Sequence, residues 1–286
     1  MLEVRANNEG RFLAMRHPDG AVFQEEEGSG AHFFNTIFLD EAAILRPLRP
    51  NNIQLQKRRS IFTSSEASLK LISLNVGQPR LIRYRGDTIS TGIFKDPVSG
   101  PVALRTLNLD GDRQADLTVH GGPYKAVYGY PSEHYEYWRE QLPDTELPWG
   151  AFGENFTTEG LSESDLHIGD RMQVGTAILQ IRQPRMPCYK LAAKFERDDM
   201  IQRFQHSGRS GFYYSVEQEG AVTNGDSFAL LSREPQAITI DEMNRLFFHD
   251  RYNRALLDKA MATPALPEDW REFLSKRLSA VESSRS

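Results

Sequence analysis

The one cysteine of this 286-residue chain lies in a segment whose composition suits a reactive thiol. Pro184 and Pro187 precede Cys188, and Arg185 and Lys190 lie within three residues of it. Because the prolines lack backbone N–H donors, we expect the segment to leave the preceding strand ladder and to present the thiol from a stiff loop. Cationic neighbours would lower the pKa of the thiol if they also lay close to it in space. Such a loop suits a nucleophile or a thiolate ligand for a soft metal, whereas most lone cysteines are small buried apolar residues.

A second group of residues able to bind or move charge lies between positions 111 and 126. Residues 111–116 read Gly-Asp-Arg-Gln-Ala-Asp, and residues 119–126 read Val-His-Gly-Gly-Pro-Tyr-Lys-Ala. Gly121 and the glycine after it permit a close backbone approach to a ligand. His120 and Lys125 could bind an anion, and His120 could also transfer protons. The same residues are equally typical of a tight turn between strands, with Lys125 in solvent.

A third stretch, residues 150–156, reads Gly-Ala-Phe-Gly-Glu-Asn-Phe. Its glycines give a loop conformational freedom, and Glu154 and Asn155 offer hydrogen bonds. By itself this pattern is more typical of a loop that connects two elements.

The elements that must position these residues are mostly short strands. β-rich segments predict strands at 71–76, 102–107, 126–130, 172–174, 177–182, 212–216 and 227–231. Gly175-Thr176 predicts a hairpin between two of them, and recurrent Gly-Asp pairs mark further turns. Many short strands with such turns favour a mainly β fold, namely a compact barrel.

Helical periodicity appears once among the strands and dominates the end of the chain. Tyr135, Trp138 and Leu142 share one face of a predicted helix that Pro143 ends. After residue 234, a capping box at 239–242 begins the first of three predicted helices, which is followed by helices at 254–261 and from 267 onward. We expect these three helices to form a small C-terminal bundle packed on the barrel.

The domain boundaries follow from these changes of pattern. Polar breakers at 25–30 and 46–52 enclose an apolar segment too short to bury itself, so residues 1–66 are predicted to be an extension of low order. An alternative is that the natural chain starts near Leu69. The barrel domain is predicted at 67–233, the three-helix domain at 234–280 and a tail at 281–286.

The charge and the hydropathy of the chain exclude several classes of protein. The net charge of −5 resides beyond residue 70, which argues against a general binder of duplex DNA. No apolar run approaches the roughly 20 residues of a membrane span, and no secretory signal peptide is visible. A lone thiol fits a reducing compartment. We therefore expect a cytoplasmic protein that has neither nucleic acid nor membrane as a partner.

Four motifs in a fixed order resemble those of the MOSC family, which is named after the C-terminal domain of molybdenum-cofactor sulfurases. They are Gly-Asp-x-Gln-x-Asp (111–116), His-Gly-Gly-x-x-Lys-Ala (120–126), Gly-x-Phe-Gly-Glu-Asn (150–155) and Pro-Arg-x-Pro-Cys-x-Lys-Leu (184–191). The resemblance runs from about Leu71 to Arg233, and the C-terminal helices resemble the bundle of the YiiM-like branch. It implies a compact MOSC-type β-barrel that binds a molybdopterin-type molybdenum cofactor.

The resemblance also implies roles for individual residues. Cys188 matches the cysteine that coordinates molybdenum as a thiolate. The implied cofactor-binding residues are Cys188 together with His120, Gly121, Lys125, Asn155 and Arg185. For proton transfer, His120 is the first candidate and Asp116 the second.

The activity that the resemblance implies is an oxidoreductase reaction, because YiiM-like proteins reduce N-hydroxylated compounds such as hydroxylaminopurines and amidoximes. The expected substrate is a small N-hydroxylated molecule. The sequence has no flavin or nicotinamide fingerprint, so we expect a separate NAD(P)H-dependent flavoprotein reductase as electron donor. A non-enzymatic carrier of the cofactor, or of sulfur as a persulfide on Cys188, is the alternative, since it would use the same thiolate loop.

Overall fold

The computed structural model describes residues 69–115 and 121–283 with their side chains, and near the N-terminus it gives the three strands β1 (Glu3–Ala6), β2 (Phe12–Arg16) and β3 (Val22–Gln24). The chain forms two compact units, Met1–Ser65 and Glu66–Ser286. β1, β2 and β3 form an antiparallel sheet within the first unit. The rest of the predicted extension at 1–66 lies outside the described residues, as do Asp116 and His120.

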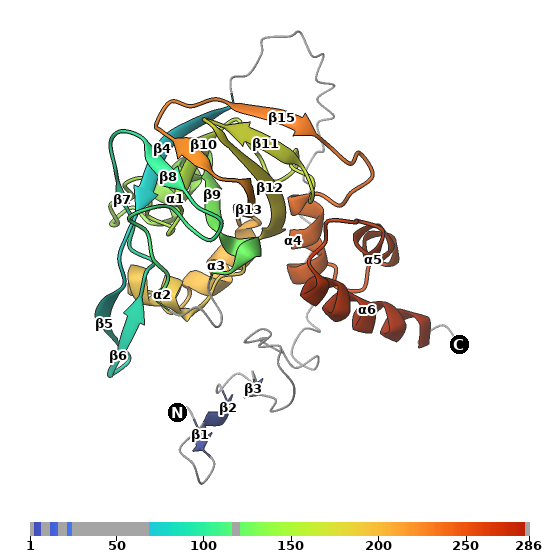
Figure 1. Ribbon diagram of the computed structural model, residues 1–286. Helices are drawn as coiled ribbons and strands as arrows, with labels where there is room; N and C mark the ends of the chain where they lie inside the picture. Colours follow the sequence, from blue (N-terminus) through green and yellow to red (C-terminus); the bar gives the residue numbers. More distant parts are fainter. Residues whose placement is uncertain (1–2, 7–11, 17–21, 25–68, 116–120, 284–286) are drawn as a thin grey trace. The chain divides into compact units, whose positions relative to one another are not determined.

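An eight-stranded mixed sheet dominates the second unit (Figure 1). In spatial order its strands are β15 (Phe228–Ser232), β11 (Arg171–Val174), β12 (Ala177–Pro184), β13 (Phe212–Gln218), β9 (Val127–Pro131), β10 (Phe156–Glu159), β4 (Lys70–Val76) and β7 (Asp96–Pro97). Neighbouring strands are antiparallel except for β9 and β10, which are parallel. The turn predicted at Gly175-Thr176 joins β11 to β12.

The predicted barrel is not found as a closed ladder of strands within the described part of the chain. Opposite the pairing of β4 with β10, β4 approaches the segment before β15 at a single bridge, Lys70 with Ser227. Further along β4 its free edge is occupied by a turn instead of a strand. The Gly225 N–H donates to the Leu71 carbonyl at 2.8 Å, and the Leu74 N–H donates to Asn224 Oδ1 at 2.6 Å. The structure is therefore a sheet-dominated fold whose sheet stays open between β4 and β15.

Two small ribbons accompany the main sheet. The pair β14 (Gly220–Val222) and β8 (Val102–Leu104) is antiparallel, and β8 ends three residues earlier than its predicted strand. The pair β5 (Arg80–Tyr84) and β6 (Asp87–Thr91) forms a hairpin that the sequence pattern did not predict. Its turn residues, Arg85 (φ 52°) and Gly86 (φ 94°), both adopt positive φ, as a tight two-residue hairpin requires. The Gly86-Asp87 pair does mark this turn in the sequence, but both strands are largely exposed, so neither has the apolar pattern of a core strand.

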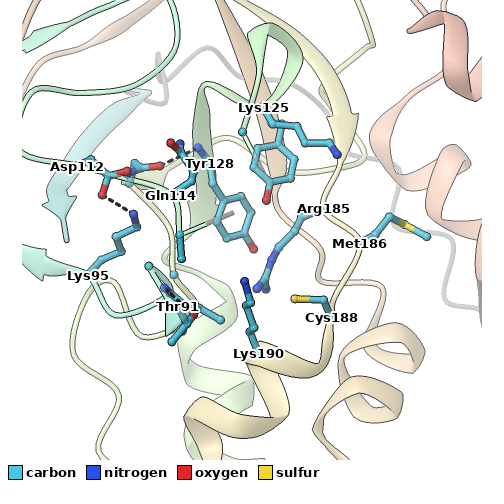
Figure 2. Close-up of a pocket in the computed structure, with 17 residues that line it drawn as sticks. Thr91, Lys95, Asp112, Gln114, Lys125, Tyr128, Arg185, Met186, Cys188 and Lys190 are labelled. Atoms are coloured by element: carbon cyan, nitrogen blue, oxygen red, sulfur yellow. Dashed lines mark hydrogen bonds and ion pairs between the residues drawn. The ribbon is translucent and has the colours of Figure 1, made fainter. Parts of the chain in front are cut away.

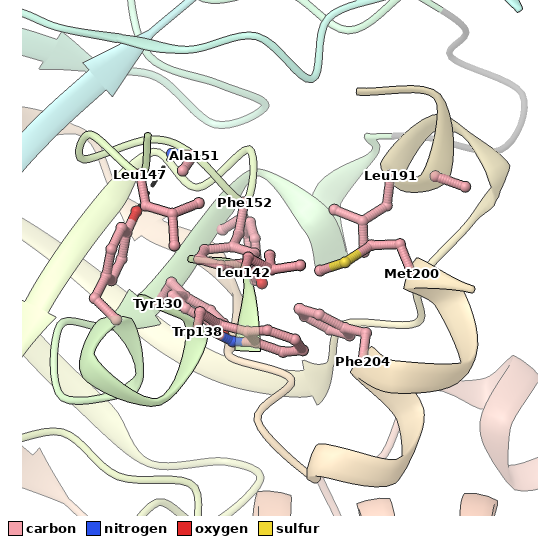
Figure 3. Packing of buried hydrophobic residues seen from close by; sticks show 12 residues of the cluster. Tyr130, Trp138, Leu142, Leu147, Ala151, Phe152, Leu191, Met200 and Phe204 are labelled. Atoms are coloured by element: carbon pink, nitrogen blue, oxygen red, sulfur yellow. Dashed lines mark hydrogen bonds between the residues drawn. The ribbon is translucent and has the colours of Figure 1, made fainter. Parts of the chain in front are cut away.

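An aromatic core connects the sheet to the helices α1 (His134–Gln141), α2 (Tyr189–Phe195) and α3 (Met200–Ser207) (Figure 3). The predicted face of α1 is confirmed, since Tyr135 and Trp138 are fully buried. The Trp138 indole N–H donates to the Tyr130 hydroxyl at 2.6 Å, and the Trp138 ring stacks on Phe204 of α3. Leu191 of α2 packs into the same cluster. The start of α2, which follows Cys188, is thus anchored to the sheet.

The helices α4 (Ile240–Phe248), α5 (Arg254–Met261) and α6 (Glu268–Ser283) form the C-terminal helical region. α4 packs against β12, and Phe247 of α4 contacts Trp270 of α6 with ring centroids 4.5 Å apart. α6 continues to Ser283, three residues into the predicted tail. Within the described residues, none of the helices is both long and apolar enough to cross a bilayer.

The predicted capping box at the start of α4 is confirmed. The Glu242 N–H donates to Thr239 Oγ1 at 3.1 Å, and the Thr239 N–H donates to Glu242 Oε2 at 2.9 Å. We expect Thr239→Ala to lower the free energy of unfolding by about 1 kcal/mol, because one amide of the first turn loses its acceptor. Urea denaturation measures the change. The exposed Thr88→Ala serves as the control and should stay near wild type; equal losses in both variants would contradict the capping argument.

Candidate functional site

A pocket lies where β12 ends and α2 begins (Figure 2). Its described lining comes from segments far apart in the chain, within residues 91–95, 112–115, 121–128, 153–155 and 185–190, together with Tyr213 of β13. Five residues singled out from the sequence line it, namely Gly121, Lys125, Asn155, Arg185 and Cys188. The fold therefore gathers described residues of all four motifs around one space.

Cys188 occupies the junction between β12 and α2. β12 continues to Pro184, which pairs with Phe212 of β13, so the prediction that the strand ladder stops before this proline is wrong. A proline is tolerated there because β11 pairs with β12 only as far as Gln180, which makes β12 an edge strand at Pro184. Only residues 185–187 separate the strand from Cys188, whose extended backbone (φ −122°, ψ 171°) leads directly into α2. Figure 2 shows the sulfur atom directed into the pocket, beside Arg185 and Lys190.

Arg185 is a buried cation that faces the pocket. Its residue is 5% exposed, and its guanidinium lies 5.0 Å from the ring centroid of Tyr128 and 5.2 Å from that of Phe204. Two aromatic rings therefore fix its position. Its Nη1 atom is buried and has no hydrogen-bond partner among the described residues. A buried guanidinium N–H without an acceptor is costly, so the side chain is ready to bind an anion that enters the pocket.

The segment 121–125 forms another wall of the pocket. Gly121 (φ 97°) and Gly122 (φ 87°) adopt a conformation that strongly favours glycine, which explains the Gly-Gly pair in the motif. A 3-10 turn, Pro123–Lys125, then places Lys125 in the lining. Burial lowers the pKa of Lys125, while the carboxylate of Asp269 in α6 acts in the opposite direction.

The oxygen and the nitrogen of the Asn155 side-chain amide both form hydrogen bonds with other residues around the pocket. Its Oδ1 accepts from the Tyr128 N–H at 3.2 Å, and its Nδ2 donates to the Asn75 carbonyl at 3.3 Å and to Asp112 Oδ2 at 3.0 Å. Asp112 in turn pairs with Lys95 and accepts from the Gly77 N–H at 2.8 Å. These bonds make Asn155 a positioning residue that ties β4, β9 and the Asp112 loop together.

Lys95 and Asp112 are the charged residues of the described lining to which the sequence analysis assigned no role. Asp112 belongs to a motif that was recognised, so its position there was a usable signal. Lys95 had no such signal, since the residues next to it in the sequence do not distinguish it from a solvent-exposed lysine. Burial lowers the pKa of Lys95, and Asp112 opposes that effect.

Glu154, next to Asn155, organises its own loop. It is fully buried and accepts hydrogen bonds from the Gly150 N–H at 2.9 Å, the Phe152 N–H at 3.0 Å and Thr157 Oγ1 at 3.0 Å. Tyr135 of α1 also donates to it. Burial raises the pKa of Glu154, although these donors counteract the change. The Gly-Glu-Asn motif thus encodes two side chains that shape the pocket wall.

Lys194 of α2 braces two of the loops that line the pocket. Its Nζ donates to the Gly150 carbonyl at 2.9 Å and to the Ile93 carbonyl at 3.2 Å. Burial lowers its pKa to about 8, against the raising effect of Glu154, and the cations Arg185, Arg80 and Lys95 lower it further. The helix that follows Cys188 is in this way tied to the opposite wall.

This pKa predicts how stability depends on pH. Between about pH 8 and pH 10.5 the unfolded chain holds a proton on Lys194 that the native protein has released, so the contribution of Lys194 to the unfolding free energy rises with pH. Its slope is at most about 1.4 kcal/mol per pH unit. Lys194→Met should therefore lose this rise, relative to wild type, in urea denaturation at pH 7.5 and 9.5. The exposed Lys276→Met is the matched control; parallel pH curves for Lys194→Met and wild type would refute the assignment.

The charge of the described lining is strongly positive. Lys95, Lys125, Arg185 and Lys190 face one carboxylate, that of Asp112. This excess contrasts with the net charge of −5 of the whole chain. A soft sulfur ligand among cations suits a ligand that combines a thiophilic metal with an anionic group.

The sequence matches two family models. The first, described as MOSC domain, covers residues 116–229, and the second, described as YiiM-like, 3-alpha helix domain, covers residues 238–280. The first match includes the strands β9 to β14 and the pocket residues from Gly121 to Tyr213, and the second includes α4, α5 and most of α6.

Relatives of known sequence or structure extend these matches. The Bacillus subtilis protein YflK is 43% identical over 207 residues, which are 72% of this chain and 93% of that protein. The crystal structure of YiiM from Geobacillus stearothermophilus superimposes with a TM-score of 0.62 at 37% identity, covering 73% of this chain and 99% of that one. A Gibberella moniliformis protein named Reductase is 35% identical over 151 residues, which are 52% of this chain and 27% of that longer protein.

Proposed function

Because the chain belongs to the MOSC-domain family and carries the helical domain of its YiiM-like members, we propose that it is a molybdenum-cofactor-dependent reductase of small N-hydroxylated compounds. One observation carries the proposal: the thiol of Cys188 shares a pocket with four cationic side chains, one of which is a buried guanidinium whose Nη1 has no hydrogen-bond partner among the described residues. The similarity to a fungal protein named a reductase supports the reaction type.

The residues present fit a molybdopterin-type cofactor. Cys188 would hold the molybdenum, since a thiolate is a suitable ligand for a thiophilic metal. Arg185 and Lys125 would hold the anionic part of the cofactor, with the backbone at Gly121 close to it. Asn155 would act indirectly, because its hydrogen bonds hold Tyr128 and Asp112 in place in the pocket wall.

The reaction needs electrons, protons and a positioned substrate. When bound, the cofactor would supply the two electrons that cleave the N–O bond. Conversion of R–NH–OH to R–NH₂ also consumes two protons and releases one water molecule. For proton delivery we propose His120 first and Asp116 second, both from the segment outside the described residues. A separate NAD(P)H-dependent flavoprotein would return the electrons.

The test uses protein expressed in a host that makes the cofactor. We expect near-stoichiometric molybdenum by elemental mass spectrometry, and reduction of 6-hydroxylaminopurine and benzamidoxime with dithionite-reduced methyl viologen as electron source. A molybdenum-loaded protein that reduces neither compound would refute the reductase proposal.

The alternative function, a carrier of sulfur or of the cofactor, uses the same partly exposed thiol. Intact-protein mass spectrometry separates the two functions. A persulfide on Cys188 in protein free of molybdenum would favour a sulfur carrier, and transfer of the cofactor to a separate apoenzyme would favour a cofactor carrier.

A further inference from the structure

The residue directly after the thiol is an exposed aromatic side chain. Tyr189 is the first residue of α2 and is 41% exposed, whereas Tyr128, Tyr130, Tyr135 and Tyr214 are almost fully buried. Its chain neighbours on both sides, Cys188 and Lys190, line the pocket. Tyr189 itself is not among the lining residues, but its partly exposed ring belongs to the segment that forms this part of the pocket wall.

The orientation of this ring is set by the β5–β6 hairpin, which lies beside α2 (Figure 1). Tyr84 at the end of β5 stacks on Tyr189, with ring centroids 6.4 Å apart and an interplanar angle of 25°. The Tyr84 hydroxyl donates to Asp198 Oδ1 at 3.1 Å, and Arg85 pairs with the same carboxylate at 2.9 Å. The ring of Tyr189 thus packs against the ring of Tyr84, which Asp198 holds in place through a hydrogen bond.

The hairpin also reaches the pocket. β6 ends at Thr91, and Thr91 and the two residues after it belong to the lining. Tyr84 and Tyr189 therefore belong to the two segments that enter the pocket wall at Thr91 and at Cys188. Another exposed tyrosine near the pocket, Tyr124, is less suitable as a stacking surface because the guanidinium of Arg182 lies 4.3 Å from its ring centroid.

From this arrangement we propose that Tyr189, braced by Tyr84, is the platform on which the planar ring of the substrate stacks, so that the protein selects aromatic N-hydroxylated compounds over aliphatic ones. The proposal rests on the proposed reductase function. Flat heterocycles stack on tyrosine faces with little dependence on their exact substituents, whereas a small aliphatic amidoxime gains no such contact. Tyr189 acts in binding and takes no part in the transfer of electrons or protons.

The test compares an aromatic and an aliphatic substrate on the holoprotein. Tyr189→Ala should raise KM for 6-hydroxylaminopurine by about tenfold, as expected for the loss of one base–aromatic stack, and should leave kcat/KM for acetamidoxime within about twofold. Tyr189→Phe keeps the ring and should behave like wild type. Tyr252→Ala, at a 54% exposed tyrosine between α4 and α5, is the matched control and should change neither substrate.

A binding measurement separates failure of this inference from failure of the proposed function. Saturation-transfer NMR with 6-hydroxylaminopurine and protein free of molybdenum reports stacking without turnover. If wild type binds the purine and Tyr189→Ala binds it about tenfold more weakly, the stacking role of Tyr189 is supported. This holds even if no reduction is observed. Equal KM increases for both substrates, or unchanged purine binding in Tyr189→Ala, would overturn it.

Discussion

Replacement of Cys188 by serine or alanine is expected to give a folded protein that retains almost no molybdenum and has lost reductase activity by roughly 10²-fold or more. The size follows from the ligand role, because loss of a residue that merely supports a metal ligand already costs 10- to 100-fold. Cys188 is partly exposed and ends a short connection, so its substitution should not disturb the core. Elemental analysis and the methyl viologen assay on the same preparation provide the measurement.

The control for this experiment uses the fact that Cys188 is the only cysteine. Thiol titration of native wild-type protein reports this one site without interference. The thiol should react with an alkylating reagent in cofactor-free protein and be protected in loaded protein. Normal molybdenum content in Cys188→Ser would show that another group holds the metal.

Replacement of Arg185 by methionine is expected to change cofactor affinity and stability in opposite directions. Cofactor affinity should fall by about 10- to 100-fold, because a charge-assisted hydrogen bond contributes about 1.5–3 kcal/mol. The unfolding free energy should stay the same or rise, since methionine fills the space between Tyr128 and Phe204 without the cost of burying a charge. Molybdenum content after dialysis against cofactor-free buffer, together with urea denaturation, gives both values.

Arg209 offers a matched control for this substitution. Its guanidinium lies 3.9 Å from the ring centroid of Tyr137, and its Nε is also buried without a hydrogen-bond partner among the described residues, but Arg209 is not part of the described pocket lining. Arg209→Met should leave the cofactor content unchanged. A purely structural role for Arg185 would instead lower stability and leave cofactor affinity intact.

Much of the architecture could be predicted because its signals are local. The alternation at 71–76, the Gly-Thr turn and the Thr239 to Glu242 capping box each depend on a few adjacent residues, and β4, the β11–β12 hairpin and the start of α4 confirm them. The aromatic stripe of α1 was equally visible, because side chains three and four residues apart share one helix face.

The features that could not be predicted depend on contacts between distant parts of the chain. Closure of the sheet fails because the turn around Asn224 and Asp226 occupies the edge of β4, which no pattern within either segment reveals. Lys95 enters the site through its pairing with Asp112, and Lys194 through two carbonyls on separate loops. The motifs identified which segments form the pocket, whereas only the fold shows which side chains line it and which ones hold its walls together.

The residues that line the pocket are far apart in the sequence, which has a consequence for the stage of synthesis at which the pocket can form. The Thr91 wall is synthesised early, whereas the position of Cys188 in the pocket depends on the pairing of β12 with β13 and of β13 with β9. Pairings between distant segments form slowly, because closing long loops costs entropy before any contact repays it. A growing chain therefore displays its thiol before the cationic wall assembles around it. Loading of the proposed cofactor would follow completion of the sheet, and until then the thiol of Cys188 would be open to oxidation.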